Sequence, residues 1–307
     1  MQKIKPRWLV VAGTAETSDA DIKYIGTPTP KRKKGEETID ESEATLALLR
    51  SNVYFESGDI SGEVNLSAPR MKVQFRLGTE GRRRTTVGLN VADHSYGLVQ
   101  RDGATVRSIS LAGADTALPT DTWLSFNVRV RGSKLEFFIE GVLVVSGQVN
   151  LPRSQLEVTL SGVGTAQLRN VQIHPVRAQA FVVMQFTDEY TTLFKEVIEP
   201  VCGEFGYEVV RGDNVYTNGL IIEDISRSIR ESAVVIADIT PNNPNVFYEV
   251  GFAHGIEKPT ILLSDRSREK LPFDISGFRL LFYDNTIGGK SVVEASLRKH
   301  LEAIRDA

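Results

Sequence analysis

The chain of 307 residues contains one cysteine, Cys202, and two tryptophans. A single cysteine excludes an internal disulfide framework and any zinc site built from several cysteines. No apolar run approaches the roughly 20 residues that a helix needs to span a bilayer. The apolar stretch after the basic N-terminus is also too short for the hydrophobic region of a signal peptide. We therefore expect a cytoplasmic protein with no membrane partner.

Neither sign of charge dominates, since 36 lysines and arginines face 39 aspartates and glutamates, for a formal net charge of -3. This balance argues against a protein that holds nucleic acid by bulk electrostatics. The sequence lacks the Gly-x-Gly-x-x-Gly turn of dinucleotide-binding folds, the lysine-bearing phosphate loop and the Gly-x-Ser-x-Gly elbow of serine hydrolases. No histidine, cysteine and aspartate residues recur at the spacing of a metal site. We therefore expect neither a cofactor nor a metal.

The first 50 residues contain few apolar positions. Residues 7–13 are typical of a strand, whereas residues 26–42 combine proline with mixed charge, a composition that disfavours a packed core. We predict an exposed, mobile loop over residues 26–42. The basic run at 31–34 could contact nucleic acid, but acidic residues follow it at once, so a solvated loop is the better interpretation.

From about residue 53 to residue 176, apolar residues alternate with polar ones. Turn residues separate the clearest stretches, which are 63–66, 72–77, 86–90, 124–130 and 134–139. Many short strands at a spacing of roughly 8 to 12 residues predict an all-β antiparallel sandwich, with one face of each strand in the core.

Within this region, Trp123 precedes a strand, a tight turn, a second strand, a Glu140-Gly141 turn and a third strand. This order resembles the concanavalin-like, or laminin-G-like, jelly roll over about residues 46–176. Sugar-cleaving members of that family carry paired carboxylates along one strand, but Glu136 and Glu140 are isolated here. The resemblance therefore implies a binding or assembly module. Carbohydrate binding would rest on analogy of fold alone.

The pattern changes at about residue 178. Residues 180–186 form a continuous apolar run, as in a strand buried on both faces. Strand and helix patterns then alternate, with helices over 193–205, 220–229, 245–255 and 292–304, and further strands over 207–210, 233–239, 259–263 and 279–283. This alternation predicts an α/β domain over residues 178–307, after a sandwich domain over residues 1–177. Five strands favour a parallel sheet with the flavodoxin-like order 2-1-3-4-5.

Such sheets bind ligands beyond the carboxyl ends of their strands, where the strand order reverses. That rule selects Met184, Gln185 and Phe186 after the first strand, Asp238 and the loop 240–245 with Asn243 and Asn245 after the third, and Tyr248 and Glu249 on the helix that follows. A carboxylate one turn into a helix, such as Glu249, can stabilise or trap the oxocarbenium-like transition state of glycosidic cleavage. The alternative is a helix residue that pairs with a neighbouring arginine or lysine.

Residues 238–240, 243–253 and 258–263 together resemble the nucleoside 2-deoxyribosyltransferase-like and TIR-like superfamily. The resemblance implies that Glu249 is the catalytic carboxylate, that Asp224 shapes the sugar site and that Gly251 lets the helix pack close to the sheet. Deoxyribosyltransferases carry an acid six residues before the catalytic glutamate, where this chain has Asn243. An amide cannot act as a base, so the resemblance favours simpler N-glycosidase chemistry.

This resemblance predicts an NAD+ glycohydrolase, a nucleotide N-glycosidase effector of prokaryotic antiviral defence regulated by the N-terminal sandwich. NAD+ would be the substrate, and we expect a homo-oligomer with an unidentified trigger ligand on the sandwich. The expected substrate contacts are Gln185, Asp224, Asp238, Asn243 and Asn245, with Phe186 or Tyr248 stacked on a base. The alternative is a non-enzymatic module that senses a nucleotide or acts as a TIR-like scaffold.

Overall fold

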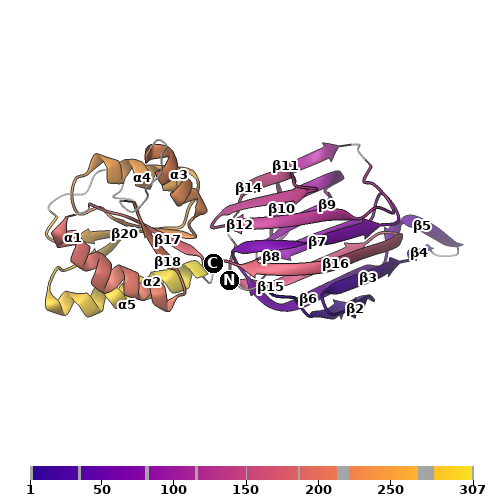
Figure 1. Ribbon diagram of the computed structural model, residues 1–307, viewed down its shortest axis with the longest axis horizontal. Helices are drawn as coiled ribbons and strands as arrows, with labels where there is room; N and C mark the ends of the chain where they lie inside the picture. The colour runs from indigo at the N-terminus through magenta and orange to yellow at the C-terminus, as the bar shows by residue number, and fades with distance from the viewer. Residues whose placement is uncertain are drawn as a thin grey trace. The chain divides into compact units, whose positions relative to one another are not determined.

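The computed structural model describes residues 3–33, 36–79, 83–114, 117–149, 151–185, 187–212, 221–268 and 280–305. The chain divides into two compact units, Met1–Val130 with Lys134–Val176, and Arg131–Ser133 with Arg177–Ala307. The first unit is built from strands and the second from alternating strands and helices (Figure 1).

Two seven-stranded sheets of antiparallel pairs make up most of the described part of the first unit. The first sheet has the order β1 (Trp8–Ala12), β6 (Leu46–Phe55), β15 (Ser154–Ser161), β8 (Lys72–Leu77), β9 (Arg83–Val91), β10 (His94–Asp102) and β11 (Thr105–Ala114). The second has the order β14 (Val142–Gln148), β13 (Lys134–Ile139), β12 (Leu124–Arg131), β7 (Gly58–Leu66), β16 (Gly164–Pro175), β3 (Asp21–Gly26) and β2 (Glu16–Ser18). The antiparallel sandwich predicted from the alternation is confirmed, and its jelly-roll-like form agrees with what the resemblance implies.

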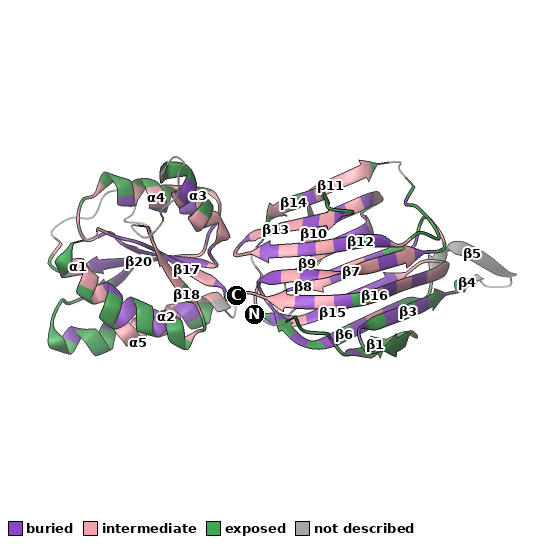
Figure 2. Ribbon diagram, in the orientation of Figure 1, coloured by how far each residue is buried: buried purple, intermediate pink, exposed green. Residues whose placement is uncertain are grey.

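The core of the sandwich lies between the two sheets. Alternate residues of each strand are buried, which gives the striped strands of Figure 2. On β8, for example, Val73, Phe75 and Leu77 enter the core, because successive side chains of a strand point to opposite faces. Phe75 of the first sheet packs against Phe126 of the second, with ring centroids 4.9 Å apart.

The expectation of a mobile loop over residues 26–42 is corrected. Most of this segment belongs to β4 (Pro28–Lys33) and β5 (Glu36–Ala44), which pair antiparallel as a two-stranded ladder. Each strand of such a ladder has an unpaired edge, so proline is tolerated where its missing N–H would point to that edge. Composition did not predict this backbone pairing.

The second unit contains a parallel sheet of five described strands. Their order is β18 (Glu208–Arg211), β17 (Gln179–Val183), β19 (Val234–Asp238), β20 (Thr260–Asp265) and β21 (Leu280–Tyr283). Counted within this unit, the order is 2-1-3-4-5, and it reverses between β17 and β19. The carboxyl ends of these two strands therefore lie side by side at one edge of the sheet.

Helices pack on both faces of this sheet. One face holds α1 (Asp188–Leu193), the π-helix η1 (Phe194–Ile198), α2 (Glu199–Glu204) and α5 (Ile287–Arg305), and the other holds α3 (Ile221–Glu231) and α4 (Pro244–Gly255). The single helix expected over residues 193–205 thus begins earlier and contains a π-helical turn. Pro200 follows this turn and has no N–H to donate, so the regular hydrogen-bond pattern is interrupted there. Within the described ranges, none of the helices has the length and apolarity to cross a membrane.

Candidate functional site

A cavity of about 210 Å³ lies at the carboxyl edge of the parallel sheet. Its lining consists of Met184, Gln185, Gly212, Ile225, Asn243, Asn245, Val246 and Glu249. These residues follow β17 and β18, face the sheet from α3, or begin α4, so they surround the point where the strand order reverses. The volume is below the roughly 300 Å³ at which pockets for drug-sized ligands begin, so it suits a small ligand or one part of a larger ligand.

The structure brings together four of the residues selected from the sequence, namely Gln185, Asn243, Asn245 and Glu249. Phe186 lies outside the described residues. Asp224, Asp238 and Tyr248 do not line the cavity. The two aspartates are buried elsewhere in the unit, and Tyr248 is exposed on the surface.

Asp238 is fully buried at the end of β19. Its carboxylate accepts hydrogen bonds from the backbone N–H of Thr240 at 2.7 Å and from the hydroxyl of Tyr283 at 2.6 Å. Burial raises the pKa of this carboxyl above its ordinary value, while the two donors oppose the shift. Asp238 therefore ties β19 to the Tyr283 end of β21 inside the fold, instead of facing the cavity.

Asp224 is 4% exposed on α3, where its carboxylate lies 3.1 Å from a guanidinium nitrogen of Arg227. Tyr248 is 55% exposed on α4. Gly251, one turn further along the same face, is also exposed, and a Cβ built there would meet no described atom within 4 Å. The expectation that Gly251 allows close helix packing is therefore wrong, because this face of α4 turns away from the sheet.

Asn243 has a local structural role in addition to lining the cavity. Its side-chain oxygen accepts a hydrogen bond from the backbone N–H of Asn245 at 3.0 Å and so caps α4. Pro244 then occupies the first turn, where its missing N–H costs nothing. Asn243 therefore fixes where α4 begins and, with it, the position of Glu249.

Glu249 lies in the second turn of α4, on the side that faces the cavity. Burial raises the pKa of its carboxyl from 4.5 to about 7. A carboxyl with such a pKa can accept or release a proton near neutral pH. Glu249 is the one carboxyl among the described lining residues.

The cavity walls also include Met184, which the carboxyl-edge rule selected, and Gly212, Ile225 and Val246, which the site prediction omitted. Gly212 directly follows β18, so the same rule applied to that strand would have found it. No group of three or more histidine, cysteine, aspartate or glutamate residues in the described part of the chain could hold a metal ion.

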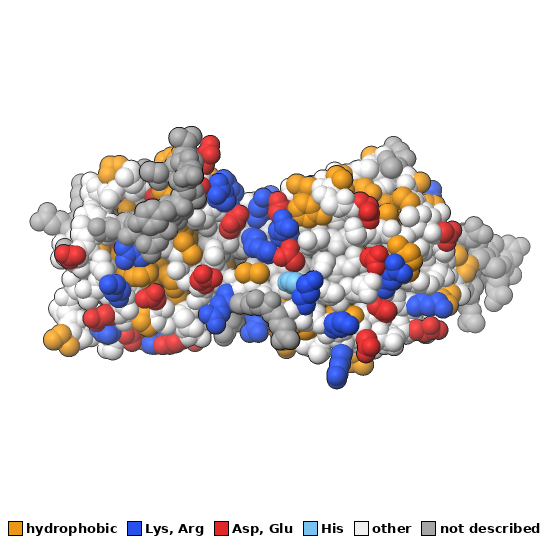
Figure 3. Space-filling view, viewed as in Figure 1, with side chains coloured by type: hydrophobic (Ala, Val, Ile, Leu, Met, Phe, Trp, Pro, Cys, Tyr) orange, Lys and Arg blue, Asp and Glu red, His pale blue; other side chains and the backbone are white. Residues whose placement is uncertain are grey.

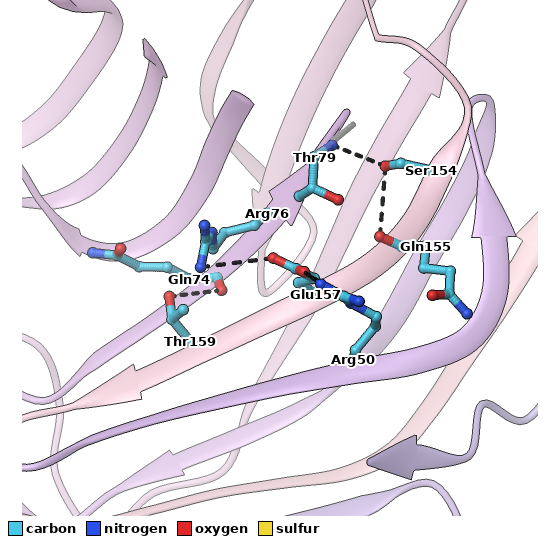
Figure 4. A network of polar contacts seen from close by, with 8 residues as sticks. All are labelled: Arg50, Gln74, Arg76, Thr79, Ser154, Gln155, Glu157 and Thr159. Atoms are coloured by element: carbon cyan, nitrogen blue, oxygen red, sulfur yellow. Dashed lines mark hydrogen bonds and ion pairs between the residues drawn. The ribbon is translucent and has the colours of Figure 1, made fainter. Parts of the chain in front are cut away.

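A second polar site lies on the outward face of the first sandwich sheet. On β15, Leu156, Val158 and Leu160 are fully buried in the core, so Glu157 and Thr159 point away from it. Figure 4 shows Glu157 and Thr159 with their neighbours from β6 and β8.

Glu157 is only 3% exposed although it points away from the core. It lies opposite Arg50 on β6 and opposite Arg76 on β8 (Figure 4). Nε and Nη2 of Arg50 donate to one carboxylate oxygen at 3.0 and 2.7 Å, and Nη1 of Arg76 lies 3.6 Å from the other. The site prediction missed this Arg50–Glu157–Arg76 network, although the alternation over residues 155–159 places Gln, Glu and Thr on one face.

Two further arginines share this face. Arg84 on β9 and Arg101 on β10 lie opposite each other in register. Burial lowers the pKa of the Arg76 guanidinium, and the charges of Arg84, Arg101 and Arg50 lower it too, whereas Glu157 raises it.

No protein-family model matches the chain, and no curated protein matches it either. Solved structures do. A carbohydrate-binding module from Bacillus subtilis has a TM-score of 0.42 at 10% identity, over 55% of this chain and 97% of that one. LamA from Z. galactanivorans, in complex with laminaritriose and laminaritetraose, has a TM-score of 0.37 at 13% identity, over 52% and 80%. The kappa-carrageenase of Pseudoalteromonas carrageenovora has a TM-score of 0.35 at 11% identity, over 55% and 95%.

These similarities concern the fold and agree with the jelly-roll sandwich. The prediction of an NAD+ glycohydrolase effector in antiviral defence is wrong, because the similar structures are a carbohydrate-binding module and glycoside-cleaving proteins. The prediction took the function of the whole chain from motifs in the α/β unit. The matches to solved structures span about half of the chain.

Proposed function

We propose that the sandwich binds carbohydrate on the outward face of its first sheet. The observation that carries this proposal is the Arg50–Glu157–Arg76 network. A carboxylate that is only 3% exposed on this face adds nothing to the apolar core, and its desolvation is costly unless it is paired. The pairing holds two guanidinium groups in defined positions on a rigid sheet, which is a preformed arrangement of hydrogen-bond donors.

Amide and hydroxyl groups surround this network on the same face. Gln74 lies beside Arg76 on β8, and Gln155 and Thr159 flank Glu157 on β15 (Figure 4). The amide of Gln74 donates to the backbone oxygen of Asn90 at 3.0 Å, which fixes its orientation. Such groups offer several donors and acceptors close together, as neighbouring hydroxyls of a sugar require.

An aromatic side chain extends the same face. Tyr54 on β6 is 49% exposed, and the guanidinium carbon of Arg153 lies 5.6 Å from its ring centroid. An exposed ring with a polar hydroxyl suits ligands that are apolar on one side and polar at their edges, as sugar rings are.

Affinity gel electrophoresis of the full chain in a panel of soluble polysaccharides tests the proposal. We expect at least one polysaccharide to retard the wild-type protein, and Gln74→Ala to remove most of that retardation. Gln167→Ala is the matched control, since Gln167 lies on the outward face of the second sheet. The proposal fails if no polysaccharide retards the chain, or if Gln74→Ala and Gln167→Ala behave alike.

The α/β cavity favours a second function. We infer that Gln185, Asn243, Asn245 and Glu249 contact a small polar ligand there, with Glu249 exchanging a proton with it. Hydrolysis of a glycosidic bond uses two carboxyl groups, and the described lining residues provide one, so binding is the better-supported role. The flavodoxin-like and TIR-like assignments of this unit are likewise proposals, which rest on the strand order and on residues 238–263.

Thermal unfolding in the presence of monosaccharides tests this second function. A ligand of the cavity raises the melting temperature of the wild type and of Tyr248→Phe, whose altered side chain lies on the exposed face of α4, but not that of Glu249→Gln. Equal shifts in Glu249→Gln and Tyr248→Phe would remove Glu249 from the binding site.

A further inference from the structure

The outward face of the first sheet carries more arginine than acid. Arg76 lies opposite Thr86 on β9, and Arg84 is two residues from Thr86 on the same face. Arg84 in turn lies opposite Arg101. Cβ atoms of directly opposed residues are about 5 Å apart and those of diagonal neighbours roughly 7 to 8 Å, so the three guanidinium groups can reach one ligand.

The charges of this face do not balance. With Arg50, these four arginines share the face with one carboxylate, Glu157, which already contacts Arg50 and Arg76. Asp102 on β10 does not offset the excess, because it pairs with Arg83 at 3.2 Å, and Arg83 precedes Arg84 and so points to the other side of the sheet. Figure 3 shows one face of the molecule, on which side chains of both charge signs are intermixed.

We propose that the carbohydrate bound by this face is anionic, and that Arg76, Arg84 and Arg101 bind its carboxylate or sulfate group. This inference rests on the proposed carbohydrate binding. A planar guanidinium matches both anions with paired, charge-assisted hydrogen bonds. Burial lowers the pKa of Arg76, and repulsion from Arg84, Arg101 and Arg50 lowers it further. A bound anion would relieve that repulsion.

An acidic polysaccharide fits this face better than a nucleic acid does. The chain has a formal net charge of -3, so long-range attraction to a polyanion is weak. Arg76, Arg84 and Arg101 form one cluster, which matches one anionic group of a glycan better than a continuous run of phosphates.

Calorimetric titration of the full chain against four probes tests the inference at constant ionic strength. The probes are neutral laminarin, polygalacturonate as a carboxylate, kappa-carrageenan as a sulfate, and a single-stranded DNA oligonucleotide. We expect one of the two acidic polysaccharides to bind most tightly and to lose affinity as salt is raised. Arg84→Gln and Arg101→Gln each weaken that binding roughly tenfold. Neither Arg84 nor Arg101 takes part in the Arg50–Glu157–Arg76 contacts, so we expect both variants to fold.

Arg129→Gln is the matched control and leaves the affinity unchanged. Arg129 lies on the second sheet, pairs with Asp59 at 3.1 Å and is 43% exposed, close to the 45% of Arg50. Laminarin binding equal to that of the acidic probes and unaffected by Arg84→Gln would overturn the anionic inference and leave carbohydrate binding intact. Absence of binding to all three polysaccharides would overturn both. DNA binding as tight as that of the acidic probes, with the same loss in Arg84→Gln, would also overturn the inference.

Discussion

The two units each hold a glutamate outside their hydrophobic cores, buried in the sandwich and half-buried in the α/β unit, and the surroundings of the two differ. In the sandwich, Glu157 is held between Arg50 and Arg76 on a sheet that other strands keep rigid. In the α/β unit, Glu249 faces a cavity, and burial alone raises its pKa to about 7. The first arrangement holds two guanidinium groups in place, whereas the second leaves a carboxyl that changes its charge near neutral pH. Burial therefore marks both residues, but the partners of each glutamate decide what it can do.

Removing a partner of Glu157 should cause the largest change in the free energy of unfolding. Arg76→Met leaves a nearly buried carboxylate with Arg50 alone, and we expect the free energy of unfolding of the sandwich to fall by about 3 kcal/mol. Tryptophan fluorescence during denaturant unfolding measures this selectively, because both tryptophans, Trp8 and Trp123, lie in this unit. Replacing Glu157 by Met in the same chain should restore much of the loss. A loss below 1 kcal/mol, as for an exposed ion pair, would show that the network does not constrain Glu157.

For Glu249, the other of the two glutamates, the pH dependence of stability tests whether the pKa of the carboxyl is raised. Its pKa is higher in the folded unit than the 4.5 of an ordinary glutamate, so the folded state holds the proton more tightly. The stabilisation is complete below pH 4.5 and is lost as the pH rises through 7. At pH 8 we expect Glu249→Gln to exceed the wild type by roughly 2 kcal/mol, and at pH 4.5 to equal it.

Circular dichroism at 222 nm follows this change, because the described helices lie in the α/β unit. If the difference between Glu249→Gln and the wild type is the same at both pH values, the carboxyl of Glu249 is not desolvated as the structure indicates.

Asp238 lies between these two cases. It is fully buried like a paired carboxylate, but its hydrogen-bond donors are neutral. Tyr283→Phe removes the hydroxyl donor at 2.6 Å, and we expect the α/β unit to lose about 1 to 2 kcal/mol of unfolding free energy. Tyr248→Phe is the control and should change stability little, because its ring is 55% exposed. Equal effects of the two changes would mean that Asp238 does not depend on Tyr283.

The smallest expected effect concerns the exposed face of α4. Gly251→Ala adds a Cβ that meets no described atom within 4 Å, so the higher helix propensity of alanine should stabilise the unit by about 0.5 to 1 kcal/mol. Unfolding followed at 222 nm measures the gain. Destabilisation would instead restore the view that α4 needs a glycine at this position.

The sequence predicted the architecture well, because the two kinds of strand have different hydrophobic patterns. Alternation in residues such as 72–77 and continuous apolar runs such as 180–186 report whether one or both faces of a strand are buried. The carboxyl-edge rule also located Gln185, Asn243, Asn245 and Glu249 around one cavity. Topology alone is sufficient for that inference, since it brings the ends of β17 and β19 together.

The sequence failed where the direction of a side chain or a distant register decides the outcome. Asp238 ends the correct strand, but its carboxylate turns towards Thr240 and Tyr283, which only the packed fold determines. Arg50 and Glu157 are 107 positions apart, so their contact depends on the register of β6 with β15. No local pattern encodes that register.

Arginine-directed labelling with phenylglyoxal tests the central claim, carbohydrate binding on the first sheet, most directly. The full chain is labelled with and without the polysaccharide that it binds most tightly, and mass spectrometry reports each site. We predict that the ligand protects Arg50, Arg84 and Arg101 and leaves Arg129 and Arg169 on the second sheet as reactive as before. Protection of the second-sheet arginines instead, or of none of the five, would contradict the proposed binding face.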